Sequence, residues 1–267
     1  MQLNCIMAVL LRQYYLIRGS VARFVPIFVW VSIDIILWGF ITKYLNTITT
    51  QTSQVVPTLL GAVLLWGFLV RVMMGTTMAF MEDMWSRNFL NLFATPLTIG
   101  SYLIGLVLTS ICTSVMALII MMVLASALFG LSFLSYGIML VPFLFLLFLS
   151  GIALGIVGCT IMMRLGPAAE WFIWPIPALI SPFSCVFYPL SILPHWMQLI
   201  SGILPTTYVF EGMRTIVAGG TIPADTLLIG AGLAIFYTIL ACLGFARIYQ
   251  RAVRTGLIAR YSAESVG

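Results

Sequence analysis

Residue types that usually carry out chemistry are scarce in this chain, and their spacing excludes the common catalytic sites. His195 is the only histidine and Lys43 is the only lysine. A P-loop needs Gly-Lys-Ser/Thr after a glycine-rich turn, whereas Lys43 lies in the sequence FITKYL. A single histidine excludes an HExxH zinc site, and His195 has no acidic neighbour in sequence to complete a Ser-His-Asp set. We therefore expect no catalytic site, no metal site and no bound cofactor in this chain.

Two acidic residues lie in or beside apolar stretches and could still act in transport. A carboxylate such as Asp34, in the middle of an apolar stretch, costs about 2.5–3.5 kcal/mol to place in hydrocarbon. We expect Asp34 to pair with Arg71, although contact with a substrate is the alternative. Glu170 is expected to be a solvated end charge near Arg164. A self-contained secondary transporter or channel that uses Asp34 and Glu170 as proton-linked sites remains an alternative function.

The composition shows what kind of scaffold must position these residues. The chain has 267 residues, of which 62% are hydrophobic and 7% are charged, whereas soluble domains carry roughly 25% charged residues. The apolar residues come in blocks of about 20, the length that crosses a bilayer. We predict an all-α, polytopic membrane protein with one domain over residues 1–267. The net charge of +5 then indicates cytoplasmic loops beside anionic membrane lipids rather than nucleic acid.

Six membrane-spanning helices are predicted. An amphipathic helix over residues 3–18 precedes them and is expected to lie along the membrane interface. Residues 43–54 are predicted to form a polar loop, and residues 249–267 a basic cytoplasmic tail. The predicted spans are about 24–41, 55–74 or beyond, 99–124, 137–163, a fifth that begins near Trp171 and meets Pro175, Pro177 and Pro182, and 227–248.

The distribution of arginines predicts the orientation of the chain. Cytoplasmic loops carry an excess of Lys and Arg. With both termini in the cytoplasm, only Lys43 and Arg214 fall outside. The cytoplasmic side then receives Arg12, Arg18, Arg23, Arg87, Arg164, Arg247, Arg251, Arg254 and Arg260, with Arg71 near the inner end of the second span.

The segment FMEDMWSRNFLNLFATPLT (80–98) is the most informative of the cytoplasmic loops. Its apolar residues share one face of a helix predicted over residues 80–96, and its charged residues lie toward the other face. One interpretation is an interfacial loop helix with satisfied charges. The other is a helix that docks onto a partner and transmits the partner's movement to two spans at once.

The order of these features resembles the permease subunit of type 2 ATP-binding-cassette (ABC) exporters. The resemblance covers nearly the whole chain and rests on LFATPLT after the loop helix and on SPFSCVFYPLSILPHWMQLISGILPTTYVFEGMR (181–214). It implies a coupling helix that contacts an ATPase through Glu82, Asp83, Trp85, Arg87, Phe89 and Pro96. It also implies a re-entrant outer gate over residues 183–214, with Phe187, Tyr188, Pro189, Pro194, Trp196, Pro205 and Tyr208.

The resemblance further implies the partners that the chain needs. These are two ABC ATPase subunits, which bind ATP and Mg, and a second permease copy, in a homodimer or a close heterodimer. The substrate path is expected at the permease interface, and the substrate is expected to be amphipathic: a lipid, glycolipid, polysaccharide or drug-like molecule. The expected location is a bacterial inner membrane. A membrane scaffold that transports nothing is a third alternative.

Overall fold

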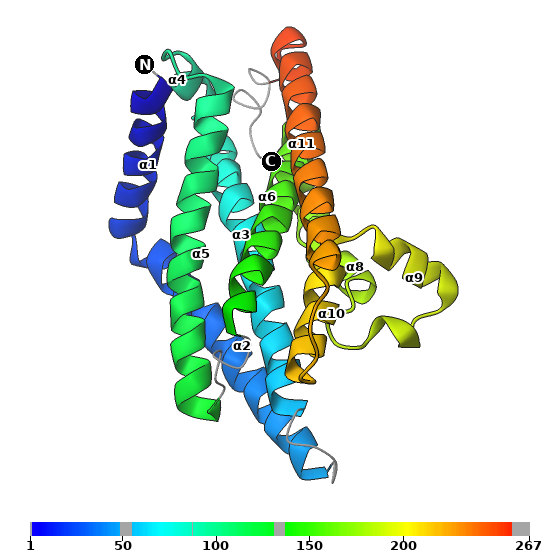
Figure 1. Ribbon diagram of the computed structural model, residues 1–267. Helices are drawn as coiled ribbons and strands as arrows, with labels where there is room; N and C mark the ends of the chain where they lie inside the picture. Colours follow the sequence, from blue (N-terminus) through cyan, green and yellow to red (C-terminus); the bar gives the residue numbers. More distant parts are fainter. Residues whose placement is uncertain (1, 49–54, 87, 131–136, 258–267) are drawn as a thin grey trace.

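The computed structural model describes residues 2–48, 55–86, 88–130 and 137–257, and these residues form helices and connecting turns without a strand (Figure 1). Five of the described helices are long and apolar enough to cross a membrane. They are α2 (Val21–Ile48), α3 (Val55–Trp85), α5 (Ile99–Phe129), α6 (Leu140–Leu165) and α11 (Ala224–Arg254). The shorter helices are α1 (Gln2–Arg18), α4 (Phe89–Phe93), α7 (Glu170–Ile173), α8 (Ile176–Ile180), α9 (His195–Gly202) and α10 (Pro205–Val217).

The long helices extend beyond the apolar blocks that predicted them. α2 continues to Ile48, so the part of the predicted 43–54 loop before residue 49 is helical, and residues 49–54 lie outside the described residues. α11 likewise continues to Arg254, into the predicted tail, of which residues 258–267 lie outside the description. Helices continue past the hydrocarbon because polar side chains can also occupy helical turns, so apolar length sets a minimum.

The ends of α5 follow the usual capping chemistry. The Thr98 hydroxyl accepts a hydrogen bond from the backbone N–H of Ser101 at 3.2 Å, which satisfies a free donor of the first turn. Gly130 ends the helix with a φ of 65°, a left-handed conformation that glycine adopts without steric cost. Local sequence therefore fixes both ends of this span.

The fifth span, predicted to begin near Trp171 and to meet Pro175, Pro177 and Pro182, is not a single helix. Residues 167–183 form four short pieces: η2 (Pro167–Ala169), α7, α8 and η3 (Ser181–Phe183). Pro175, Pro177 and Pro182 each lack a backbone N–H and crowd the preceding turn, which breaks the helical ladder. The connecting residues Trp174, Pro175 and Ser181 nevertheless stay in the right-handed helical region. The segment therefore runs as an interrupted helix.

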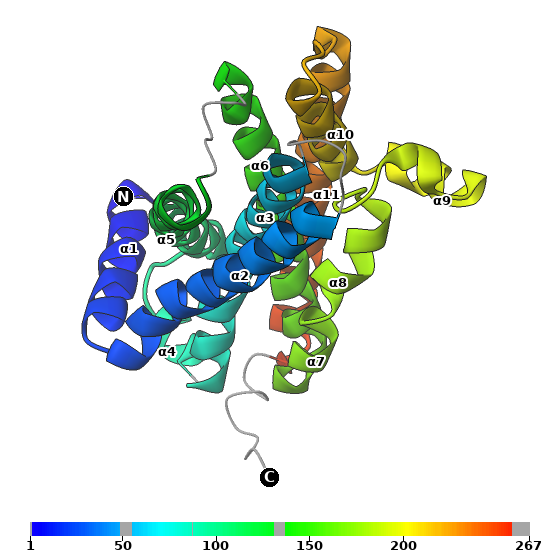
Figure 2. The same cartoon turned by 90° about the horizontal axis from the view of Figure 1, so that it is seen from below.

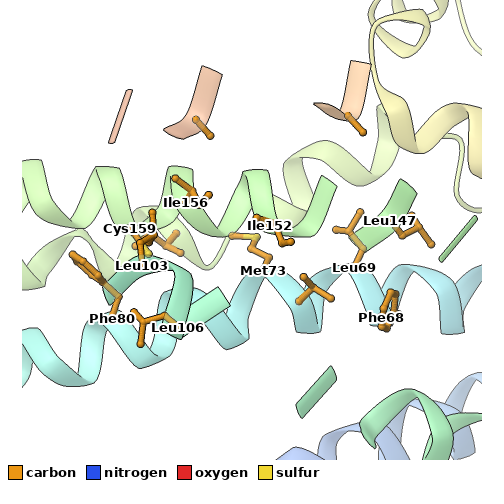
Figure 3. Packing of buried hydrophobic residues seen from close by; sticks show 14 of the residues in the cluster. Phe68, Leu69, Met73, Phe80, Leu103, Leu106, Leu147, Ile152, Ile156 and Cys159 are labelled. Carbon is orange, nitrogen blue, oxygen red and sulfur yellow. The ribbon is translucent and has the colours of Figure 1, made fainter. Parts of the chain in front are cut away.

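The core of the bundle is the contact between α3 and α6, where Met73 and Ile152 lie between the two helices in Figure 3. Three glycines on α6, Gly151, Gly155 and Gly158, allow the backbones to approach closely. A Cβ on Gly151 would lie 2.8 Å from the Val72 Cβ, and one on Gly155 would lie 3.0 Å from the Met73 carbonyl oxygen. Small residues at such spacing are typical of helices that pack within membranes.

Two shorter parts extend from this bundle. α1 runs beside α5 at the end of the molecule that also carries α4 (Figure 1). The outer segment after η3 forms η4 (Leu190–Ile192), α9 and α10, and α9 projects to the side of the bundle in both views (Figures 1 and 2). α9 lies within residues 183–214, and α10 begins there and continues to Val217.

Candidate functional site

The coupling segment, defined here as residues 82–96, does not form the single helix predicted over residues 80–96. Its first residues are the last turn of α3, which ends at Trp85, and α4 supplies a separate short helix. The Asn88 N–H donates to the Asp83 carbonyl at 3.1 Å and closes the turn between them. Helical periodicity placed Met81, Met84 and Phe89 on the buried side, as found, but it implied exposure for the buried Asp83 and did not reveal the turn.

The predicted contact residues of this segment divide into exposed and buried members. Trp85 is 43% exposed and Pro96 is exposed, so both are available to a partner. Asp83 and Phe89 are buried at 1% and 4% exposure and offer no surface in this conformation. Glu82 is half-buried and lies 3.5 Å from the Arg23 guanidinium. Arg87 lies outside the described residues.

Asp83 occupies the most elaborate polar contact at this end of the molecule. The Arg12 guanidinium on α1 donates to both carboxylate oxygens, with Nη1 at 2.9 Å from Oδ2 and Nη2 bonded to Oδ1. The hydroxyl of Tyr102 on α5 donates to the same Oδ2 at 2.7 Å. The hydrogen bonds to Asp83 raise the pKa of Arg12. A two-pronged guanidinium–carboxylate contact is the geometry in which such pairs are strongest.

An aromatic cluster surrounds this contact and joins four helices. The ring of Tyr102 lies against Phe89 and Phe93 of α4, with ring centroids 6.0 and 5.8 Å apart. Phe80 of α3 packs edge-on against Phe89 at 5.1 Å and against Phe245 of α11 at 6.1 Å. α4 is thus anchored by its apolar face, and its other face is left to solvent or a partner.

The outer gate segment, residues 183–214, is held together by a pair on α10. Arg214 donates to Glu211 at 2.8 Å, to the Val186 carbonyl at 2.9 Å and to the Cys185 carbonyl. Glu211 accepts from the backbone N–H of Leu190 at 2.8 Å. Burial lowers the pKa of Arg214, and the charge of Glu211 opposes that effect.

This pair binds irregular backbone whose N–H and C=O groups are not paired within a helix. Among the described residues, Cys185 is the one non-glycine residue with a positive φ, at 54°, a conformation uncommon for residues with a side chain. Arg214 and Glu211 supply hydrogen bonds to the backbone of residues 185, 186 and 190, which lies outside the helices or at the start of η4.

The predicted gate residues shape the same segment. Pro194 immediately precedes α9, and Pro205 is the first residue of α10, positions at which a missing N–H costs no helical hydrogen bond. Tyr188 and Tyr208 donate their hydroxyls to the carbonyls of Pro182 and Gly202. Pro189 is extended and precedes η4. His195 and Trp196 are exposed on α9.

An open cavity of about 550 Å³ lies between α3 and the interrupted helix. Its lining is mainly apolar and aromatic, and it includes two predicted gate residues. Phe187 also stacks on Trp38 of α2, with ring centroids 5.4 Å apart. The lining consists of Trp66, Val70, Met74, Trp174, Pro177, Ala178, Ser181, Pro182, Phe187 and Tyr188.

Asp34 and Arg71 lie on the neighbouring helices α2 and α3. They are not among the ion pairs that the described residues form, which are Arg12–Asp83, Arg23–Glu82 and Arg214–Glu211. Asp34 is exposed on the single chain. Glu170 accepts a hydrogen bond from the Trp174 indole at 3.1 Å. The expected pairing of Asp34 with Arg71 therefore stays a hypothesis about the assembled protein.

Sequence reasoning missed part of this site. Tyr102 lies inside an apolar span, where its phenol resembles an ordinary interfacial aromatic, and no local signal connects it to Asp83. Arg12 stood apart from the apolar face of its helix, which indicated only a polar environment. Glu211 and Arg214, three residues apart on one helix face, were a readable signal of a pair.

One family model matches the chain over residues 7–218, and it is described as ABC-2 type transporter. The match includes α1 from residue 7 onward, the coupling segment and the whole outer gate segment. No curated protein sequence matches the chain.

Proposed function

The chain belongs to the ABC-2 type transporter family, and we propose that it is the permease subunit of an exporter driven by separate ATPase subunits. The family is a membrane component of transport and is not itself catalytic. The absence of a Gly-Lys-Ser/Thr sequence supports the same division of labour, because the only lysine, Lys43, lies in FITKYL. In this proposal two ABC ATPase subunits bind ATP and Mg, and the permease binds neither.

The exposure of Asp34 is the observation that best supports a second permease copy. A carboxylate at mid-membrane depth is costly in lipid and normally faces protein or a water-filled path. In the single chain Asp34 is exposed on α2, a helix that is also largely exposed around it. We infer that a second copy, identical or closely related, covers this face and that the substrate path runs along the joint.

The cavity supports an amphipathic substrate. Indole, phenyl and thioether groups line it together with one serine and one tyrosine hydroxyl, a mixture that suits an apolar chain with a few polar groups. Phe187 and Tyr188 belong to both the cavity lining and the outer gate segment. A lipid, glycolipid, polysaccharide or drug-like molecule fits the proposal, and a movement of the gate would alter the cavity directly.

The coupling segment is proposed to receive the ATPase movement. Trp85 and Pro96 are exposed there, whereas Asp83 and Phe89 act from within the fold. The proposed topology places this end and both termini in the cytoplasm, with the interrupted helix as the sixth crossing and α1 at the interface. The excess of arginine at that end supports this orientation, and a bacterial inner membrane is the proposed location.

A flux assay tests the function. The chain is purified alone and with an ATPase subunit, placed in liposomes and offered a fluorescent phospholipid and rhodamine as amphipathic probes. The proposal predicts probe movement that requires ATP and the ATPase. Flux by the chain alone in a proton gradient, lost in Asp34→Asn, would instead establish the secondary transporter.

Cross-linking tests the second copy. Leu37→Cys on the exposed face of α2 should form disulfide-linked dimers in membranes, and Leu240→Cys on the exposed face of α11 is the matched control. The unmodified chain controls for its five native cysteines. Equal cross-linking at both positions would contradict the assigned interface.

A further inference from the structure

The position of Asp83 is unusual for a residue in the coupling segment. Its side chain is 1% exposed, although Trp85, two residues later at the end of α3, is 43% exposed. A buried carboxylate is tolerated only when it is paired and hydrogen-bonded. Its partners come from two other helices, 71 and 19 residues away in sequence, so the carboxylate at the end of α3 is not satisfied within its own helix.

Both partners of Asp83 reach it from helices that lie beside each other. Arg12 projects from α1 and Tyr102 from α5, and together they make three hydrogen bonds to the carboxylate. Next to them, α1 lies so close to α5 that a Cβ on Gly105 would be 2.6 Å from a Val9 methyl group. We propose that Arg12 and Tyr102 are positioning residues that hold the end of α3 through Asp83, so that α1 moves with the coupling segment as one unit.

Two further contacts join the N-terminal part of the chain to the coupling segment. The Cys5 thiol lies 4.0 Å from the Pro96 carbonyl, at the other end of the coupling segment. At the start of α2, Arg23 lies 3.5 Å from Glu82. The first helix thus touches the coupling segment at both ends, and the buried contact at Asp83 is the strongest of these because it excludes most water.

The chemistry of the contact explains why the parts move together. If α1 moved away, the buried carboxylate would lose the guanidinium that neutralises it, and Tyr102 would be left as its one donor. Leaving a buried charge unpaired is much costlier than breaking an exposed pair. A push on the coupling segment therefore carries α1 along, and with it the start of α2, the helix on which the proposed interface lies.

The outer side of α1 determines what this movement reaches. Leu3, Met7 and Leu11 are more than half exposed along one stripe, and Tyr14 and Tyr15 continue it. In the proposed topology this stripe faces the lipid interface. The inference rests on the proposed function, because the force comes from the ATPase.

Hydrogen exchange of the complex, measured in lipid nanodiscs with and without ATP, tests the inference without a known substrate. In the unaltered complex, ATP should change the exchange of residues 82–96 and of residues 2–18 together. In Arg12→Gln, the change at 82–96 should persist and the change at 2–18 should be lost. In Tyr102→Phe, which keeps the guanidinium contact but removes the third hydrogen bond, the change at 2–18 should be reduced. Arg12→Lys keeps the positive charge but not the two-pronged guanidinium contact, so its response at 2–18 should fall between those of Arg12→Gln and the unaltered protein.

The matched controls are Arg18→Gln and Tyr15→Phe, both at exposed positions on α1. Both should behave like the unaltered protein. If residues 2–18 respond to ATP as strongly in Arg12→Gln and Tyr102→Phe as in the controls, the inference is wrong. If residues 82–96 do not respond to ATP in any form, the proposed function is wrong instead.

Hydrogen exchange of the permease without the ATPase then still tests the contact of Arg12 and Tyr102 with Asp83. Arg12→Gln and Tyr102→Phe should each speed exchange in residues 2–18 and 84–93 together, by about tenfold for the loss of a charged hydrogen bond. Faster exchange in only one of the two segments would contradict the link between them.

Discussion

Replacing Arg214 with methionine should destabilise the outer gate segment. Methionine has similar reach but no donors, so the carbonyls of Cys185 and Val186 and the carboxylate of Glu211 lose a charged partner. A buried polar group left unsatisfied costs about 1–3 kcal/mol. Because the Arg214 side chain is only 16% exposed, water replaces little of what is lost. We expect a loss of roughly 3 kcal/mol in the free energy of unfolding.

The assay is thermal unfolding of the purified chain in nanodiscs, followed by tryptophan fluorescence. At roughly 2–4 °C per kcal/mol for a chain of this size, Arg214→Met should melt roughly 6–12 °C below the unaltered protein. Arg214→Lys should fall between the two, since one ammonium group cannot reach all three acceptors. Arg251→Met, at an exposed site on α11, is the matched control. If Arg214→Met and Arg251→Met have the same melting temperature, the role given to Arg214 in the outer gate segment is refuted.

Three further outcomes follow from the packing of single residues. Gly151→Ala should lower the melting temperature because its Cβ would lie 2.8 Å from Val72, whereas Gly232→Ala, with open space around it, should raise it slightly. Thr98→Ala should cost about 1 kcal/mol in the free energy of unfolding, measured by the same melting assay, because it removes the cap of α5. Ala178→Trp should fill part of the cavity and slow ATP-driven flux of the fluorescent phospholipid, without a large loss of assembly.

The long helices could be predicted because apolar length is a strong and local signal. Blocks of about 20 apolar residues identified all five long helices. Pro175, Pro177 and Pro182 lie in the predicted fifth span and mark where its helix is interrupted. How the pieces would be arranged was not predictable, because that depends on their contacts with α3 and α6.

The polar contacts were the least predictable part of the site. Helical periodicity placed Asp83 on the charged side of its segment, together with Glu82, and implied exposure. The contact that buries it comes from Arg12, 71 residues away, and sequence spacing carries no information about such a pair. Glu211 and Arg214 were within one turn of each other. The carbonyls of Cys185 and Val186 became acceptors for Arg214, and the Leu190 N–H became a donor to Glu211, only through the tertiary fold.

The most direct test of the central claim is the requirement for ATP and a partner ATPase. The chain is reconstituted in liposomes with that ATPase, and the flux of fluorescent phospholipid is measured with ATP, without ATP and with an ATPase disabled in hydrolysis. The account predicts flux only with ATP and the active ATPase, and native mass spectrometry of the same complex should show two copies of each subunit. Equal flux from the chain alone, without ATP, would contradict it.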